Sequence, residues 1–200
     1  MPWAALAGYL LFAVLAFGVR GVVHYRRTGS SGFRGLASAG PVERLAGVGF
    51  FVTLVAGGLA PGLAIAGVAP WIIVPATRAV RVAAIVLYVV GVAVTLWAQF
   101  AMRDSWRVGV DPAERTELVM RGPFRWVRNP IFSAMLVAVA GLVLAVPNAV
   151  AVVAFVALLG AVELQVRAVE EPHLLRVHGE AYRTWARVTG RFVPGLGRLR

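Results

Sequence analysis

The sequence contains no cysteine, so the chain has no disulfide, no thiol nucleophile and no thiolate metal site. Histidine is also scarce. His173 and His178 are five positions apart, which differs from the i, i+4 spacing of two metal ligands on one helical face, and His24 is remote from both in sequence. We therefore predict no metal site.

Charged residues are also scarce. Only 14% of the 200 residues are charged and 60% are hydrophobic, well above the roughly 45–50% that is usual for soluble domains. Lysine is absent, so all 20 basic residues are arginines; against 9 acids they give a formal charge of +11. Arginines that flank apolar runs are typical of proteins in contact with membrane lipids, whereas a nucleic-acid partner requires a soluble basic face. We predict an all-α integral membrane protein without a nucleic-acid partner.

Uncharged runs predict where the chain crosses the membrane, since about 20 apolar residues span the hydrocarbon core. The first run, residues 2–19, lacks a basic segment before it and is interpreted as a retained span, followed by a loop over residues 20–44. The run 45–77 contains three prolines, so we place a span at 45–59, a break at Pro61-Gly62 and an irregular stretch near Trp71. The third span covers residues 82–102.

The last uncharged run, residues 129–162, has Pro147-Asn148 at its centre and permits either one kinked helix or a hairpin of two. With a turn there, five arginines of residues 20–44, six of 103–128 and seven from 167 onward share one side, leaving Arg78 and Arg81 on the other. A single crossing would place seven arginines on the wrong side. We therefore predict five transmembrane helices in the cell membrane, with the N-terminus outside and the C-terminus cytoplasmic.

An amphipathic helix is predicted beyond the last span. Apolar and aromatic residues recur there at helical spacing, with charged residues between them. They are Leu174, His178, Ala181, Tyr182, Trp185 and Val188. The helix is expected to lie on the cytoplasmic membrane surface or to cover a site, and the tail from Arg191 to Gly195 is expected to be extended.

Two polar clusters are expected to meet at the mouth of the hairpin. Residues 121–130 lead into the fourth span, and the fifth span is followed by the second cluster. That cluster comprises Glu163, Gln165, Arg167, Glu170 and Glu171. Each residue has a structural explanation when taken alone. Asn129-Pro130 suits the start of a helix, for example, and the arginines suit interfacial anchoring.

Taken together, the order and spacing of these motifs resemble a known family. The stretch Arg-Gly-Pro-Phe-Arg-Trp-Val-Arg-Asn-Pro (121–130), a hairpin, Glu170-Glu171, Gly-Glu-Ala-Tyr (179–182) and Arg-Phe-Val-Pro (191–194) are similar to the isoprenylcysteine carboxyl methyltransferase and phospholipid methyltransferase superfamily. The resemblance covers residues 99–196. It divides the chain into two N-terminal spans with their cytoplasmic loop (1–78) and a catalytic core (79–200).

The resemblance implies S-adenosylmethionine as cofactor and a lipophilic small molecule or lipid as methyl acceptor: a prenyl-type carboxylate, a lipid amine or a hydroxyl. The residues implied to bind the cofactor are Leu118, Val119, Gly122, Pro123, Arg128, Asn129, Pro130, Glu170 and Glu171. Those implied in catalysis are Arg128, Asn129, Arg167, Arg187 and Arg191. Asn129 occupies a position where many members have histidine, and asparagine is not a base near neutral pH.

Two alternatives remain at this point. A membrane reductase similar to the sterol reductases would share a C-terminal hairpin and bind a nicotinamide cofactor. A non-catalytic lipid-binding protein could keep the same fold. The paired carboxylates beside the Gly122-Pro123 loop argue against a plain transport or lipid-binding protein, and the chain is short for the reductase class. Methyl transfer from a sulfonium needs mainly alignment and exclusion of water, so it requires no metal.

Overall fold

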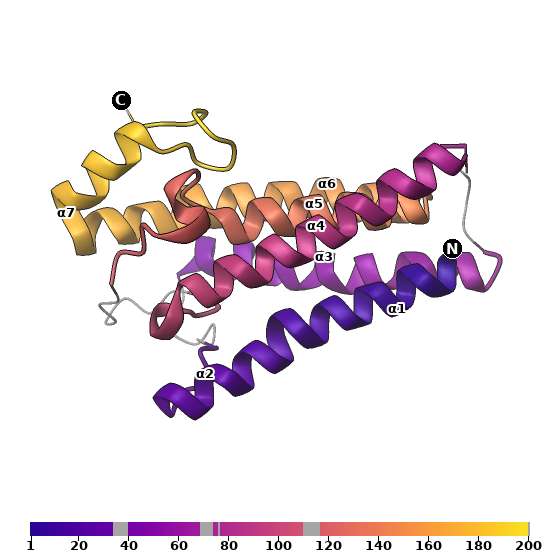
Figure 1. Cartoon of the computed structure of the whole chain (residues 1–200), viewed down its shortest axis with the longest axis horizontal. Coiled ribbons are helices and arrows are strands. Elements are labelled where there is room, and N and C mark those ends of the chain that lie inside the picture. The colour runs from indigo at the N-terminus through magenta and orange to yellow at the C-terminus, as the bar shows by residue number, and fades with distance from the viewer. Residues whose placement is uncertain (34–39, 69–73, 76, 110–116, 200) are drawn as a thin grey trace.

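The computed structural model describes residues 1–33, 40–68, 74–75, 77–109 and 117–199, and these form helices with no β-strand among them. Figure 1 shows long helices that run side by side, with the N-terminus at one end and α7 (Glu171–Val188) at the other. The prediction of an all-helical protein is confirmed.

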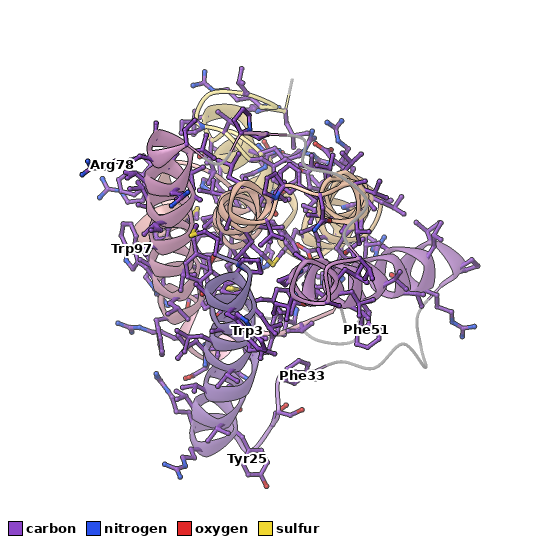
Figure 2. All side chains as sticks on the ribbon, turned by 90° about the vertical axis from the view of Figure 1, so that its right-hand side faces the viewer. Trp3, Tyr25, Phe33, Phe51, Arg78 and Trp97 are labelled. Atoms are coloured by element: carbon purple, nitrogen blue, oxygen red, sulfur yellow. The ribbon has the colours of Figure 1, made fainter. Side chains whose placement is uncertain are left out.

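Four described helical segments are long and apolar enough to cross a membrane: Pro2–Thr28, Pro41–Ile65, Arg78–Ala101 and Ala149–Val188. A fifth apolar helix, α5 (Pro130–Ala145), is shorter at 16 residues. Large apolar side chains cover the outside of these segments, and Figure 2 shows Phe51 and Trp97 projecting from the bundle. Such a surface suits hydrocarbon as its solvent.

The first helix is longer than predicted. It comprises α1 (Pro2–Ala13), a π-helical turn η1 (Val14–Val19) and α2 (Arg20–Thr28), so the loop expected to begin at Arg20 was placed wrongly. A charge ends an apolar span, but it does not end a helix. The helix stops only at Gly29, whose φ of 74° lies in the left-handed region that favours glycine at a helix end.

The second helix, α3 (Pro41–Ile65), passes through Pro61, so the predicted break at Pro61-Gly62 was wrong. Backbone groups in an apolar environment find partners only within a helix or on neighbouring helices, which keeps proline-containing helices intact. A residue between α5 and α6 also bonds to α3 beside Pro61, since the amide of Asn148 donates to the carbonyl of Ala60 at 3.1 Å. The predicted irregular stretch near Trp71 lies outside the described residues.

The third helix, α4 (Arg78–Ala101), begins four residues before the predicted span, capped by the Thr77 hydroxyl. The predicted interruption at Pro147-Asn148 is present: α5 ends at Ala145 and α6 (Ala149–Leu164) begins after it. Asn148 caps α6 by accepting a hydrogen bond from the Ala151 N–H at 2.9 Å.

The last helix continues from α6 through a second π-helical turn, η4 (Gln165–Glu170), into α7. A helix was predicted here, and Tyr182 and Trp185 are buried as its pattern requires. Ala181 and Val188 are exposed, however, so the predicted apolar face is only partly covered. Gly179 interrupts the helical geometry with φ 52° and ψ −122°.

Close backbone contact joins α4 to α5 and sets the position of their ends. A Cβ atom added to Gly91 would lie 2.4 Å from the backbone N of Ala138 and 2.6 Å from the carbonyl O of Ala134. A Cβ atom added to Gly141, on α5, would lie 2.6 Å from the carbonyl O of Ala84 on α4. Small residues allow helices in membranes to pack this closely. The two helices therefore fix the loop between them, which carries residues 117–129.

The ends of the bundle differ in charge. We call the end formed by α2, the start of α3, the end of α4, the start of α5 and α7 the arginine-rich end. The arginines there include Arg20, Arg26, Arg27, Arg44, Arg103, Arg107, Arg121, Arg125, Arg128 and Arg167. Arg78 and Arg81 lie at the start of α4, at the opposite end.

Substitution of Gly91 by alanine is expected to destabilise the fold by roughly 1–3 kcal/mol, because the new methyl group would overlap backbone that cannot move away. Gly160→Ala is the matched control, since a Cβ there meets nothing within 4 Å and alanine favours helix by about 0.5–1 kcal/mol. Thermal unfolding of the detergent-purified variants should give opposite signs. Equal effects would contradict the close contact.

Candidate active site

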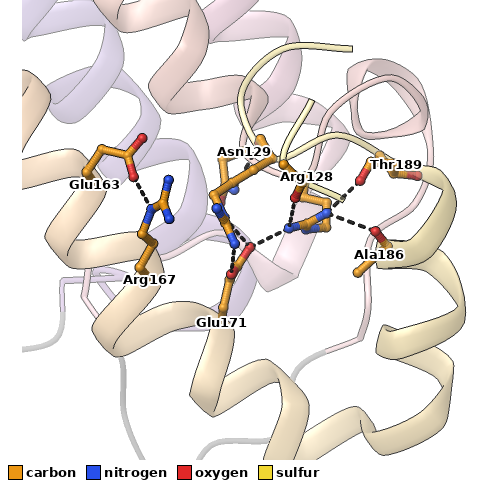
Figure 3. Close-up of polar contacts among 9 residues, drawn as sticks. Arg128, Asn129, Glu163, Arg167, Glu171, Ala186 and Thr189 are labelled. Atoms are coloured by element: carbon orange, nitrogen blue, oxygen red, sulfur yellow. Dashed lines mark hydrogen bonds and ion pairs between the residues drawn. The ribbon is translucent and has the colours of Figure 1, made fainter. Parts of the chain in front are cut away.

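A buried arginine lies at the centre of the arginine-rich end. The Arg128 side chain is 1% exposed, and its Nη2 donates to Glu171 Oε1 at 2.6 Å and to the carbonyl of Gly197 at 3.0 Å. Its Nη1 donates to the carbonyls of Ala186 at 3.1 Å and Thr189 at 2.5 Å (Figure 3). One side chain thus holds the start of α7, the end of α7 and the C-terminal tail.

Glu171 receives a second arginine. Arg191 donates from Nε to Glu171 Oε1 at 2.8 Å and from Nη2 to Oε2 at 2.9 Å, the two-pronged geometry that makes such pairs strong. The hydrogen bond to Glu171 raises the pKa of Arg191 above its usual value. Both carboxylate oxygens of Glu171 are therefore engaged by arginines.

Asn129 and Ser133 hold the backbone of the tail. The N–H of Asn129 and its side-chain amide both donate to the carbonyl of Arg191 at 3.1 Å, and the Ser133 hydroxyl donates to the carbonyl of Phe192 at 2.7 Å. Asn129 directly precedes α5, but its side chain makes no capping bond to that helix. Its amide acts as a neutral donor, a role that needs no titrating group.

Two of the residues implied in catalysis lie outside this network. Arg167 pairs with Glu163 one turn earlier on the same helix, and Figure 3 shows the pair apart from Glu171. Arg187 points to Glu180 at 3.5 Å with its side chain 57% exposed. The structure thus brings together Arg128, Asn129 and Arg191, and it places Arg167 and Arg187 at the surface.

The segment implied to approach the cofactor packs at the end of α4. Val119 and Phe124 form a buried cluster with Ala98, Tyr182 and Trp185, and Leu118 packs against it. Gly122 begins a short 3-10 helix, η3 (Gly122–Arg125), at φ 58°, and a Cβ there would lie 3.2 Å from Ala101 Cβ. Pro123 and Pro130 are buried beside it.

The backbone of this segment lies outside regular secondary structure. Residues 117–120 belong to no helix or strand, and no backbone hydrogen bond joins them to another residue of the described part of the chain. Backbone N–H and C=O groups in such a segment, beside an aromatic cluster, can donate to and accept from a ligand. The approach of Leu118 and Val119 to a cofactor stays a prediction.

The two adjacent glutamates differ in their contacts. Glu170 is half-buried and accepts one hydrogen bond, from Gln165 Nε2 at 3.2 Å on the same helix. It precedes Leu174 by four residues, and Leu174 packs on the cluster that contains Val119, so the two lie on one helical face. Glu170 thus has one hydrogen-bond donor among the described residues, whereas both oxygens of Glu171 are engaged by arginines.

Sequence reasoning missed the polar groups that hold the tail. Ser133 and the carbonyls of Ala186, Thr189 and Gly197 carry no motif, because a backbone carbonyl leaves no trace in a sequence. Arg121, interpreted as an anchor, donates from Nε to the carbonyl of Ala101 at 3.0 Å. The only sign of these contacts in the sequence was the Ser133 hydroxyl, four residues after Asn129 on the first turn of α5.

Replacing Glu171 by alanine should destabilise the protein by about 3–5 kcal/mol, because Arg128 would be left buried without a counterion. Glu180→Ala removes a carboxylate that also faces two arginines, but at the surface, and is expected to change stability by less than about 1 kcal/mol. Chemical unfolding in detergent measures both. A Glu171→Ala protein as stable as wild type would show that the ion pair does not hold the tail.

Comparison with known proteins agrees with the motifs. A family model described as phospholipid methyltransferase matches residues 79–181, slightly more than half of the chain. The match runs from the first turn of α4 into α7 and includes Arg128, Asn129, Glu170 and Glu171. Searches of curated proteins and of solved structures returned no match. The resemblance drawn from the residues is therefore confirmed, and the chain belongs to the phospholipid methyltransferase family.

Proposed function

We propose that this protein transfers a methyl group from S-adenosylmethionine to a lipophilic acceptor at the arginine-rich end. The observation that carries the proposal is that three features inside the family match lie beside one aromatic cluster: the irregular backbone of residues 117–120, Gly122, and Glu170 with its single described hydrogen bond. The match supports a membrane methyltransferase and gives no support to the reductase alternative.

The donor set suits this cofactor without a metal. A carboxylate accepts from ribose hydroxyls or from an ammonium group, and backbone amides recognise the edge of a base. Gly122 supports the fit, because its left-handed φ and its contact with Ala101 bring the backbone close to α4 where a side chain would be strained. When bound, S-adenosylmethionine supplies an electrophilic methyl group on a sulfonium.

The residues of the chain would then align the partners and exclude water. Tyr182 and Trp185 on α7 cover the cluster that contains Val119, and Arg128 and Arg191 hold that helix and its tail closed through Glu171. In-line displacement depends on such alignment, where an error of about 1 Å can cost roughly 100-fold in rate. We assign Glu170 to cofactor binding and Glu171 to holding α7 and the C-terminal tail over the site.

The acceptor is expected to enter from the bilayer, because the outer surface of the bundle is apolar up to the arginine-rich end. Asn129 stands where a histidine base is common in the family and donates to the carbonyl of Arg191. Without a base there, an acceptor that is already deprotonated at neutral pH, such as a prenyl-type carboxylate, is favoured over an amine or hydroxyl.

The same proposal includes a topology. Residues 79–200 would form the catalytic core and residues 1–78 two further spans, with α5 and α6 as the fourth and fifth crossings. The arginine-rich end would face the cytoplasm and the N-terminus the outside, in keeping with the positive-inside rule. At 16 residues, α5 would cross a locally thinned bilayer or extend with its flanking residues, whereas α6 continues through η4 and is long enough to cross.

Calorimetric titration with S-adenosylhomocysteine tests the cofactor, with a nicotinamide dinucleotide as comparison ligand. Saturable binding of the first alone is expected. Binding of the second alone would point to a reductase, and binding of neither by folded protein would point to a non-catalytic role. Glu170→Gln should weaken S-adenosylhomocysteine binding roughly tenfold by removing a carboxylate acceptor, with unchanged thermal stability. Unchanged affinity in this variant would remove Glu170 from the site.

Single cysteines test the topology cleanly, since the chain has none of its own. Val68→Cys, at the end of α3, and Pro147→Cys, between α5 and α6, should react with a membrane-impermeant maleimide added outside intact cells. Thr184→Cys, exposed on α7, should react only after the membrane is opened. Labelling of Pro147→Cys from inside alone would show that α5 and α6 do not form a crossing hairpin.

A further inference from the structure

Arg20, which lies outside the family match, reaches the end of α4 from the first helix. The residue is 2% exposed. Its Nη2 donates to the carbonyl of Arg103 at 2.6 Å and approaches the carbonyl of Gln99 at 3.4 Å. Its guanidinium also lies 4.7 Å from the centre of the Trp106 ring. A buried arginine is thus held by backbone carbonyls and an aromatic face rather than by a carboxylate.

These two carbonyls lie at or just beyond the end of α4. The last turn of a helix has carbonyl groups without helical partners, and its end carries partial negative charge. Arg20 approaches the carbonyl of Gln99 in that turn and donates to the carbonyl of Arg103, which begins a short 3-10 helix η2 (Arg103–Ser105) and also accepts from the Trp106 N–H at 3.4 Å. Arg121 donates to the carbonyl of Ala101 from the other side. The end of α4 is therefore capped by two arginines, one from the first helix and one from the segment that enters the proposed site.

The backbone just after α4 is strained. Arg103 has a φ of 49°, in the left-handed region that costs a residue with a side chain roughly 1 kcal/mol or more. Its carbonyl accepts the shortest of the hydrogen bonds from Arg20. The bond holds a turn that the chain would otherwise relax, and this turn directs the chain away from α4.

The capped end of α4 is also the surface on which the proposed cofactor segment rests. Ala98, Ala101 and Met102 of this end pack in one cluster with Val119, Tyr182 and Trp185. The contact extends to Gly122, whose added Cβ would be 3.2 Å from Ala101 Cβ. A shift of the last turn of α4 would therefore displace residues 118–124.

The π-helical turn η1 directs Arg20 to this place. Such a turn carries one extra residue relative to an α-helix and is frequent at functional sites. Gln99 Nε2 donates to the carbonyl of Ala16 within the turn at 3.0 Å, so Ala16 and Arg20 face α4 together. Nearer the N-terminus the helix is held by Tyr88, whose hydroxyl donates to the carbonyl of Gly8 at 2.6 Å.

From these contacts we infer that Arg20 is a positioning residue for the cofactor site: by capping α4 and holding the turn at Arg103, it sets the position of the 118–124 segment. The inference rests on the proposed function, since that segment is assigned to the cofactor there. The first helix would then help to position the cofactor site in addition to crossing the membrane.

Arg20→Gln tests the inference against Arg27→Gln, which removes an exposed arginine paired with Asp104 at the same end. Arg20→Gln should weaken S-adenosylhomocysteine binding roughly tenfold with full binding capacity, because the site is displaced and not destroyed. It should also speed hydrogen exchange at the amides of Phe124, Trp126 and Val127. Arg20→Lys keeps the charge and should recover part of both effects, and Arg27→Gln should match wild type.

A double variant tests the turn at Arg103 through which Arg20 is inferred to act. Arg103→Gly, placed in the Arg20→Gln background, should restore affinity in part by relieving the strained turn.

The exchange readout separates this inference from the proposed function. If wild-type protein binds no S-adenosylhomocysteine but Arg20→Gln still loosens residues 124–127, the cofactor assignment fails and the positioning role stands. If Arg20→Gln binds S-adenosylhomocysteine like wild type, or if exchange increases only along the first helix, Arg20 is an anchor of that helix alone and the inference is overturned.

Discussion

Hydrogen bonds from arginine side chains to backbone carbonyls hold the arginine-rich end together. Helices in hydrocarbon satisfy their own backbone, but where they end their last carbonyls need donors from elsewhere. Arg20 and Arg121 supply them at α4, and Arg128 supplies them at α7 and the tail. A guanidinium offers five donors in a fixed plane, so one side chain joins several segments, which an ammonium group does less well. The exclusive use of arginine in this chain fits that requirement as well as the charge rule for membrane proteins.

Charge placement predicted the helical bundle and the interruption at Pro147-Asn148, because a membrane restricts both the length of apolar runs and the side on which arginines accumulate. It failed where the helix is longer than the apolar run. The first helix continues past Arg20 into a polar region, and α3 continues through Pro61, beside which the amide of Asn148 donates to the carbonyl of Ala60. Both errors arise because local sequence does not report what a neighbouring helix supplies.

The candidate site shows the same division. The two polar clusters do contact each other through Arg128 and Glu171, since a short hairpin forces its two ends together, whereas Asn129 bonds to Arg191. The motifs could not distinguish Glu170 from Glu171, because one step along a helix turns a side chain by about 100° and the π-helical turn η4 before them shifts the register in a way that no spacing rule anticipates. Glu171 consequently faces two arginines, whereas Glu170 accepts a hydrogen bond only from Gln165 among the described residues. Arg167 and Arg187, equally plausible by spacing, fall on the outer faces of their helices.

Asparagine at position 129 has a physical consequence for the fold as well as for the chemistry. Its backbone and its amide both donate to the carbonyl of Arg191, while Arg128 beside it donates to Thr189 and Gly197, so consecutive residues hold the tail from two sides. A histidine there would donate from one ring nitrogen and gain charge as the pH falls. With asparagine the tail is held at this position by groups that do not titrate near neutral pH. In the function proposed above, Asn129 would therefore keep α7 and the tail in place and leave any proton transfer to the acceptor or to another residue.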